Sequence, residues 1–279
     1  MELVTIDKPD DFRKHHKLLG QGSEGSVFLY DNQAIKIFHN NFAFEVSKTN
    51  KEQKLKVLME LKDTLNQVSL PTDLIYDKNG NFIGYIMDLI ETYHKIRDFY
   101  DMAKSKLSLA LKVFYYRELE EIVKVLHSYG IYLVDVNLSN FLLNSQCKPV
   151  LTDSDGFKVG EYKAEEYYAF YVKYYKEVTG DHHLQYIDEF SLTFRTLELL
   201  YPNFRDGLRK SIPNYDIYHP DRVIEYIGTT VDDLDIPGEL RSFYIDTLEG
   251  RKHEFIGPYL GCISNPNKRY LKKKSRLII

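Results

Sequence analysis

The hydrophobic pattern of the N-terminal part predicts several short strands and one helix. Residues 16–38 alternate apolar and polar positions around a glycine-rich turn and a second polar turn, which predicts strands joined as hairpins. Residues 44–67 are polar at first and then continue as LKVLMELKDTL, a helical pattern. Residues 74–87 place apolar runs around DKNG (77–80), a type I′ turn signal. We therefore expect a small antiparallel sheet with one helix.

The rest of the chain has a mainly helical pattern. Residues 109–126 predict an amphipathic helix, and residues 161–180 and 186–200 predict two more. Residues 131–157 interrupt this pattern with two apolar strands around a polar turn, followed by a group of carboxylates. The apolar stripe of the first helix recurs at three- and four-residue spacings and consists of Leu111, Tyr115, Leu119, Ile122 and Leu126.

Composition narrows the class of protein. A chain of 279 residues with 43% hydrophobic and 28% charged residues is large enough for two lobes with apolar cores. The net charge of −4 argues against a nucleic-acid partner. The two cysteines, Cys147 and Cys262, form no disulfide framework and no zinc site. Because no signal-peptide core and no run of eighteen apolar residues is present, we expect a cytoplasmic protein without a membrane partner.

Oxygen-bearing side chains stand out in residues 131–157. Asp135 and Asn140 lie five residues apart in an otherwise apolar segment, and Asp153 follows thirteen residues after Asn140. Two oxygen ligands at loop ends, together with a carboxylate that can accept a hydroxyl proton, are typical of magnesium–phosphate chemistry. The alternative is a set of ordinary polar residues at the loop ends of a large domain.

A glycine-rich turn and a lysine precede this segment. Residues 19–27, LGQGSEGSV, match G-x-G-x-x-G-x-V, and Gly20, Gly22 and Gly25 would allow backbone N–H groups to approach phosphate oxygens. In dinucleotide-binding proteins this glycine pattern is followed by a helix. Here the sequence after the turn predicts a hairpin, which favours a flap that covers phosphates. Lys36 lies in an apolar strand and is expected to be partly desolvated and to need anionic partners; an ordinary strand-edge lysine is the alternative.

In this order and spacing the motifs resemble those of the protein-kinase-like superfamily, and the chain looks like an atypical, microbial Ser/Thr protein kinase. The resemblance extends over residues 18–271. It implies an α+β, bilobal protein-kinase-like fold. The N-lobe (1–88) would contain the small antiparallel sheet, the glycine-rich loop, the lysine strand and one helix. The C-lobe (89–279) would be mainly helical and would contain the catalytic and metal-binding loops.

The resemblance also implies a role for each matched residue. Lys36 would hold the α- and β-phosphates of ATP, and Asn140 and Asp153 would bind Mg²⁺. Asp135 would align the acceptor hydroxyl and take its proton, so the catalytic set is Asp135, Lys36 and Asn140. The other nucleotide-binding positions would be the glycine-rich turn, a helix glutamate and the end of a strand: Gly20, Gly22, Gly25, Val27, Glu52, Met87, Asp88 and Ile90.

The glutamate expected to pair with Lys36 is the least defined of these residues. Glu52 is preferred because the helical pattern places it on the inward face. Glu60 and Glu45 are alternatives. Each of them could instead be a solvated glutamate in an i,i+4 pair with a lysine, such as Glu52 with Lys56.

The sequence departs from the kinase pattern in two places. Leu133 and Val134 replace the histidine and arginine of the catalytic loop, so a phosphate on an activation segment would find no arginine there. The metal-binding D-F-G is altered, and Asp155, two residues after Asp153, is interpreted either as a partner of the metal ligand or as a turn residue. Residues 161–180 stand in place of the usual activation segment.

Two further residues have a structural interpretation. Asp188, near the start of the predicted helix 186–200, resembles the kinase aspartate that hydrogen-bonds the catalytic-loop backbone; a plain N-terminal helix acid is the alternative. His127 is interpreted as a helix-end histidine rather than a base.

We therefore expect ATP- and Mg²⁺-dependent transfer of the γ-phosphoryl group to a hydroxyl, first of all Ser or Thr of a protein substrate that the sequence does not identify. A pseudokinase that binds nucleotide or a partner is one alternative, favoured by the missing histidine and arginine. A kinase acting on a small-molecule acceptor is the other. Retention of every residue expected to touch metal, phosphate or acceptor favours an enzyme. The oligomeric state is left open.

Overall fold

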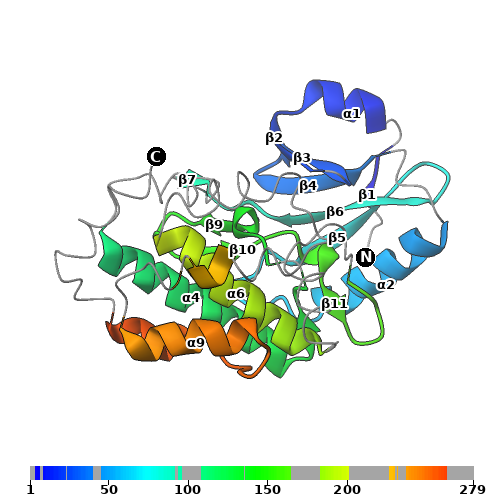
Figure 1. The fold of residues 1–279 in the computed structure, drawn as a ribbon. Coiled ribbons are helices and arrows are strands. Elements are labelled where there is room, and N and C mark those ends of the chain that lie inside the picture. Colours follow the sequence, from blue (N-terminus) through cyan, green and yellow to red (C-terminus); the bar gives the residue numbers. More distant parts are fainter. Residues whose placement is uncertain are drawn as a thin grey trace. The chain divides into compact units, whose positions relative to one another are not determined.

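The structure is a computed structural model, and it describes residues 4–6, 9–22, 24–39, 45–91, 94–95, 108–134, 136–164, 183–200, 226–229, 231 and 237–262. The fold is α+β (Figure 1). The chain divides into two compact units, and each is described by itself. The first contains Met1–Tyr93 and Phe141–Ala164, and the second contains His94–Asn140 and Glu165–Ile279. The division into lobes at residue 88 stays a prediction.

A six-stranded sheet forms the first unit, and five of its strands are antiparallel, as the sequence predicts (Figure 1). The remaining strand, β1, pairs in parallel with β5 at the edge. From that edge the strands are β1 (Val4–Thr5), β5 (Pro71–Tyr76), β6 (Phe82–Asp88), β4 (Gln33–Phe38), β3 (Gly25–Tyr30) and β2 (Leu18–Gln21).

Two hairpins in this sheet confirm the strand predictions. Between β3 and β4, Asp31 and Asn32 have φ angles of 42° and 63°, the positive values that both central residues of a type I′ turn require. Between β5 and β6 only Gly80 has a positive φ, of 80°, while Asp77 accepts hydrogen bonds from the backbone N–H groups of Asn79 and Asn81. The hairpin is therefore as predicted, but the type I′ turn predicted for it is wrong.

The two faces of the sheet differ in character. An apolar cluster covers one face, and Phe12 of α1 (Pro9–His15) packs against it. Side chains alternate between the faces along a strand, so Lys36, between two members of that cluster, points to the other face, which α2 (Glu45–Met59) covers. The cluster consists of Ile6, Phe28, Ile35, Ile37, Ile75 and Ile86.

Helix α2 ends earlier than the predicted range of 44–67. After Met59 the chain continues in tight turns, such as the hydrogen bond from Leu61 N to Leu58 O at 3.1 Å. The backbone farther along then pairs with a strand: Leu151 N donates to Gln67 O at 2.8 Å. Because these groups form a ladder with a strand distant in sequence, they are not free to continue the helix.

A further hairpin, outside the six-stranded sheet, belongs to the first unit. It consists of β9 (Phe141–Leu143) and β10 (Pro149–Leu151), with Leu151 opposite Phe141. The short 3₁₀ helix η2 (Ser154–Gly156) and β11 (Lys158–Val159) follow it. The end of this hairpin therefore fixes where the carboxylates of residues 153–155 begin.

The second unit is mainly helical among its described residues. The predicted helix 109–126 is confirmed as α4 (Leu109–Ser128), which Ser108 caps by accepting a hydrogen bond from Leu111 N. The predicted helix 186–200 is confirmed as α6 (Leu184–Leu200). The other elements are β7 (His94–Lys95), β8 (Ile131–Tyr132), η1 (Leu138–Asn140), α9 (Gly238–Leu248) and η3 (Gly257–Cys262). Buried residues of α4, α6 and α9 form the apolar interior.

Two predictions cannot be compared with the structure. Most of the helix predicted for 161–180 lies outside the described residues, and so does Asp135. For the part of the chain that is described, none of the helices has both the length and the apolar composition to cross a bilayer.

A buried glutamate in α4 predicts a pH-dependent stability. Glu120 is 1% exposed and accepts the backbone N–H of Gly257 at 2.8 Å, and burial raises the pKa of its carboxyl to about 7. A raised pKa means that the folded state binds the proton more tightly than the unfolded state. Protonated Glu120 therefore stabilises the folded state relative to the ionised form. This contribution is fully present below the ordinary pKa of about 4.5 and is lost as the pH rises through about 7.

Glu120→Gln removes this titration and keeps an acceptor for Gly257. We expect the variant to be more stable than wild type by about 2–3 kcal/mol at pH 8, with the difference shrinking towards zero near pH 4.5. Urea denaturation at both pH values measures the difference. Glu121→Gln, an exposed neighbour with 62% side-chain exposure, is the control and should show little change. An equal difference at both pH values would contradict the expectation.

Candidate functional site

The central strand β4 positions Lys36. Its Cα partners are Val27 in β3 and Tyr85 in β6, so both neighbouring strands flank it. The side chain is only 8% exposed. Gly84 of β6 allows this close packing, because a Cβ there would overlap the carbonyl oxygen of Lys36. Lys36 is therefore fixed by the middle of the sheet rather than by an edge.

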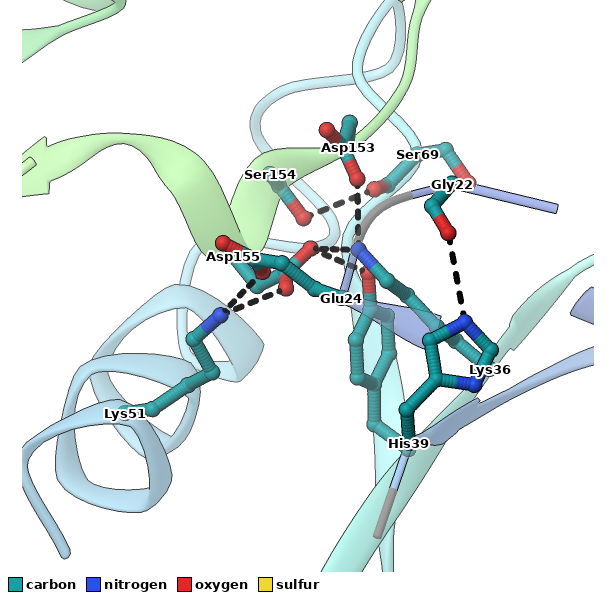
Figure 2. Close-up of polar contacts among 10 residues, drawn as sticks. Gly22, Glu24, Lys36, His39, Lys51, Ser69, Asp153, Ser154 and Asp155 are labelled. Carbon is teal, nitrogen blue, oxygen red and sulfur yellow. Dashed lines mark hydrogen bonds and ion pairs between the residues drawn. The ribbon is translucent and has the colours of Figure 1, made fainter. Parts of the chain in front are cut away.

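Two carboxylates hold the Lys36 ammonium group (Figure 2). Lys36 Nζ lies 2.5 Å from Asp153 Oδ1 and 2.7 Å from Asp155 Oδ1. Burial alone would lower the pKa of Lys36, but the negative charges of Asp155 and Asp153 raise it well above its usual value. Lys36 is consequently a buried, charged ammonium with anionic partners.

Asp155 is the buried member of this pair of carboxylates. It is 0% exposed and accepts a hydrogen bond from Tyr85 Oη at 2.8 Å. It also forms an ion pair with Lys51, whose Nζ lies 3.1 Å from Asp155 Oδ2. Burial alone would raise the pKa of Asp155, but Lys36 and Lys51 hold that pKa well below its usual range. Three donors on one buried carboxylate offset the cost of removing it from water. The prediction left open whether Asp155 is a partner of the site or a turn residue, and its contacts make it a partner of Lys36.

Asp153 is the accessible carboxylate. Its side chain is 49% exposed, and its backbone is left-handed, with φ of 65°. The loop that follows is fixed by Ser154 Oγ, which donates to Ser69 O at 3.1 Å. Mg²⁺ retains several water ligands and takes one or two carboxylates plus phosphate oxygens. Asp153 is an exposed carboxylate of this kind, with Oδ1 in contact with Lys36.

Helix α2 directs two lysines, not a glutamate, into this region. Lys51 and Lys54 are each 2% exposed. Lys51 Nζ lies 2.6 Å from Glu24 Oε2, and Lys54 Nζ donates to Phe157 O at 2.9 Å. Burial, and then the charge of Lys51, lowers the pKa of Lys54 to about 8. The helix is therefore attached to the glycine-rich turn and to the loop after Asp153.

The pairing of Lys36 with Glu52 is not formed in the structure. Glu52 Oε1 accepts from Lys56 Nζ at 2.6 Å and from Tyr76 Oη at 2.9 Å. The i,i+4 pair with Lys56 is the alternative interpretation that the sequence allowed. Of the other two candidates, Glu60 is exposed and the side chain of Glu45 lies outside the described residues.

The reason lies in the face of α2 that is buried. The prediction took Leu55 and Met59 as the inward stripe, but the fully buried residues are Leu55 and Leu58. Positions 51 and 54, each four residues before one of these leucines, are buried on the same face, whereas position 52 is rotated away from it. The missed residues Lys51 and Lys54 could have been found from that spacing. Glu24 and Tyr85 carried no such signal.

The glycine-rich turn is closed by backbone contacts. Gly22 N donates to Gly25 O at 2.9 Å, and His39 N donates to Glu24 O at 2.8 Å. Only Gly25 is required by packing, because a Cβ there would lie 2.7 Å from Ile37 O. A Cβ would meet nothing within 4 Å at Gly20 and would make an ordinary contact with Gly25 O, at 3.9 Å, at Gly22. The predicted role of these two glycines, backbone access to phosphate, stays a prediction.

Strand β6, an inner strand of the sheet, and the residues just after it contain the predicted adenine contacts. Met87 is buried within β6, Asp88 ends β6 with its side chain exposed, and Ile90 follows with partial exposure. Asp88 Oδ1 lies 3.4 Å from Lys62 Nζ. Contacts of these residues with an adenine ring stay predictions.

In the second unit, α6 holds the loop around position 135. Asp188 is 0% exposed and accepts the backbone N–H groups of Leu133 and Val134 at 2.8 and 2.7 Å. Arg195 Nε donates to Val136 O at 3.0 Å. The predicted role of Asp188 is confirmed, and the flanks of Asp135 are fixed on both sides. His127 Nε2 lies 2.9 Å from Asp188 Oδ2, in line with a helix-end histidine.

Asn140 ends the 3₁₀ helix η1, where its backbone N–H donates to Asn137 O at 2.9 Å. It belongs to the second unit, whereas Asp153 belongs to the first. Joint binding of Mg²⁺ by these two residues therefore stays a prediction.

Taken together, an antiparallel sheet with a glycine-rich turn, a buried strand lysine and an accessible aspartate is compatible with a protein-kinase-like fold. Known proteins point in the same direction. Protein kinase YegI of Escherichia coli is 26% identical over 152 residues, which is 50% of this chain and 23% of YegI. Kinase suppressor of Ras A of Caenorhabditis elegans is 27% identical over 154 residues, 54% of this chain and 20% of that protein.

These similarities support a kinase-like relationship. The chain spans only about a fifth to a quarter of the length of these curated relatives, 23% and 20%. No protein-family model matches the chain.

The close approach at Gly84 gives a testable expectation. Because the atom in the way is backbone, Gly84→Ala must displace β4 at Lys36. We expect a loss of stability of about 1–3 kcal/mol, as for other overpacked cores. Thermal and urea denaturation measure it. Gly238→Ala is the control, since a Cβ there meets nothing within 4 Å, and wild-type stability for Gly84→Ala would show that the strands are not so closely packed.

Proposed function

We propose that this chain is an ATP- and Mg²⁺-dependent phosphotransferase that moves the γ-phosphoryl group to a Ser or Thr hydroxyl of a protein. The observation that carries the proposal is the Lys36 ammonium, buried in the central strand and held within 2.7 Å of both Asp153 and Asp155. A charged, oriented ammonium next to an accessible carboxylate suits a metal-bound polyphosphate.

The residues of the first unit would bind and orient the nucleotide. Lys36 would contact the α- and β-phosphates, and the glycine-rich turn around Gly20 and Gly22, where no side chain stands in the way, would approach phosphate oxygens. Asp153 would hold Mg²⁺ together with Asn140. Mg²⁺ bound there would supply positive charge to the phosphate oxygens.

Asp135 would act on the acceptor. Its carboxylate would align the hydroxyl and take its proton, while Asp188 and Arg195 keep the flanking backbone in place. Positioning and charge stabilisation, rather than covalent chemistry, would supply most of the acceleration. A protein acceptor is preferred over a small molecule because one relative is named a protein kinase.

Labelled ATP tests this function. The purified chain is incubated with γ-labelled ATP and Mg²⁺, alone, with general protein substrates and with small-molecule hydroxyl acceptors. The proposal predicts label on Ser or Thr of a protein, identified by mass spectrometry. Label only on a small molecule would favour the small-molecule kinase. Nucleotide binding without any transfer would favour the nucleotide-binding pseudokinase.

A further inference from the structure

Four charged side chains of the first unit are connected by three consecutive ion pairs, which together form a chain of charges. Lys36 contacts Asp155 at 2.7 Å, Asp155 contacts Lys51 at 3.1 Å, and Lys51 contacts Glu24 at 2.6 Å (Figure 2). Each residue comes from a different element: strand β4, the 3₁₀ helix η2 that follows Asp153, helix α2 and the glycine-rich turn. These are the elements that carry the candidate nucleotide-binding motifs.

Most side chains in this chain of charges are buried, so their charges must be neutralised by one another rather than by water. The side chains of Lys36, Asp155 and Lys51 are 8%, 0% and 2% exposed, and Glu24 is 21% exposed. A buried charge that loses its partner is costly, because water cannot replace the partner. The three buried side chains are therefore mutually dependent, and Glu24 is the member nearest to solvent.

The charges around Lys36 are shared within one group of side chains. Asp155 accepts from two ammonium groups, Lys36 on Oδ1 and Lys51 on Oδ2. Lys36 also contacts Asp153, and Lys51 also contacts Glu24, so the five side chains carry two positive and three negative charges. The group therefore offers a ligand a fixed position of the Lys36 ammonium rather than an excess of positive charge.

We propose that Lys51 and Asp155 are positioning residues that orient Lys36 and hold the glycine-rich turn, through Glu24, for nucleotide phosphates. The glutamate that was expected on α2 is replaced by two residues, Asp155 of η2 and Lys51 of α2. Movement of α2, of the glycine-rich turn or of η2 then changes the position of Lys36. This inference rests on the proposed function.

The test compares Lys51→Met with Lys56→Met. Both substitutions remove one lysine from α2, but Lys56 is 46% exposed and pairs with Glu52 outside the chain of charges. Hydrogen exchange of the glycine-rich turn is measured without nucleotide, and Mg²⁺–ATP affinity is measured by calorimetry on folded protein. Lys51→Met should accelerate exchange in residues 22–26 and weaken affinity at least about tenfold, whereas Lys56→Met should do neither.

A charge exchange separates positioning from plain stability. Asp155→Asn should weaken Mg²⁺–ATP binding, and Lys51→Glu should do so more strongly because it places a second carboxylate beside Asp155. The double variant Lys51→Glu/Asp155→Asn should recover much of the affinity, since a carboxylate on α2 can then pair with Lys36. Recovery of affinity without recovery of melting temperature is a result that a merely structural role does not produce.

Glu24→Gln keeps the proposal testable if the buried variants do not fold, because Glu24 lies on a turn and is partly exposed. It should accelerate exchange in the turn and weaken affinity about threefold to tenfold. Wild-type exchange and affinity in both Glu24→Gln and Lys51→Met would overturn the inference. If wild type itself binds no Mg²⁺–ATP, the proposed function fails; if wild type binds and the variants bind equally well, only the inference fails.

Discussion

Asp135→Asn is expected to lose nearly all phosphoryl transfer and to keep Mg²⁺–ATP affinity. The substitution preserves the shape of the side chain but removes the carboxylate that would align the acceptor hydroxyl and take its proton. Such groups contribute on the order of a hundredfold or more to the rate. Because the effect is on the transition state, the loss should appear in the rate constant rather than in ATP binding. Single-turnover rates and calorimetric affinities measure the two quantities separately.

Asp63→Asn is a suitable control, since Asp63 is an exposed aspartate in the turns after α2. It should leave both quantities unchanged. A parallel loss of ATP affinity in Asp135→Asn would instead make Asp135 a structural residue of the loop that Asp188 holds.

Asp153→Asn is expected to remove the dependence of ATP binding on Mg²⁺. The amide has nearly the same size but no charge, so it is a poor Mg²⁺ ligand, and it also weakens the 2.5 Å contact with Lys36. We expect the affinity for ATP in Mg²⁺ to fall on the order of a hundredfold, since even the groups that orient metal ligands contribute about ten- to a hundredfold. The ATP-induced rise in melting temperature should shrink to the value seen in EDTA.

The buried neighbour Asp155 keeps its contact with Lys36 in this variant, so the fold should persist. Melting temperatures without nucleotide check that point. An unchanged ATP-induced shift in Asp153→Asn would show that Asp153 is not the metal ligand.

Local patterns predicted most of the elements correctly. The alternation of apolar residues and the turn at Asp31 and Asn32 predicted the β3–β4 hairpin, and the apolar stripe of α4 predicted that helix. The end of α2 was not predictable in the same way. The last residues of the predicted range, near Gln67, pair with Leu151 instead, a contact between residues far apart in the sequence.

The candidate site was predicted only in part, because some of its contacts also join residues far apart in the sequence. An apolar strand around Lys36 indicated a desolvated ammonium that needs anionic partners, and the structure provides Asp153 and Asp155. The choice of Glu52 depended on the rotation of α2, and a shift of one residue in the assumed inward face replaced a glutamate with Lys51. A lysine facing inward is stable only because Asp155 and Glu24 meet it there, which no local pattern shows.

Calorimetric titration of the wild-type chain with ATP tests most directly whether Lys36, Asp153 and Asp155 form a magnesium–nucleotide site. The titration is done in Mg²⁺ and in EDTA, with AMP in Mg²⁺ as the control that lacks the β- and γ-phosphates. The account predicts saturable binding of one ATP in Mg²⁺, binding at least about tenfold weaker in EDTA, and weak binding of AMP. No saturable ATP binding, or equal affinity with and without Mg²⁺, would contradict it.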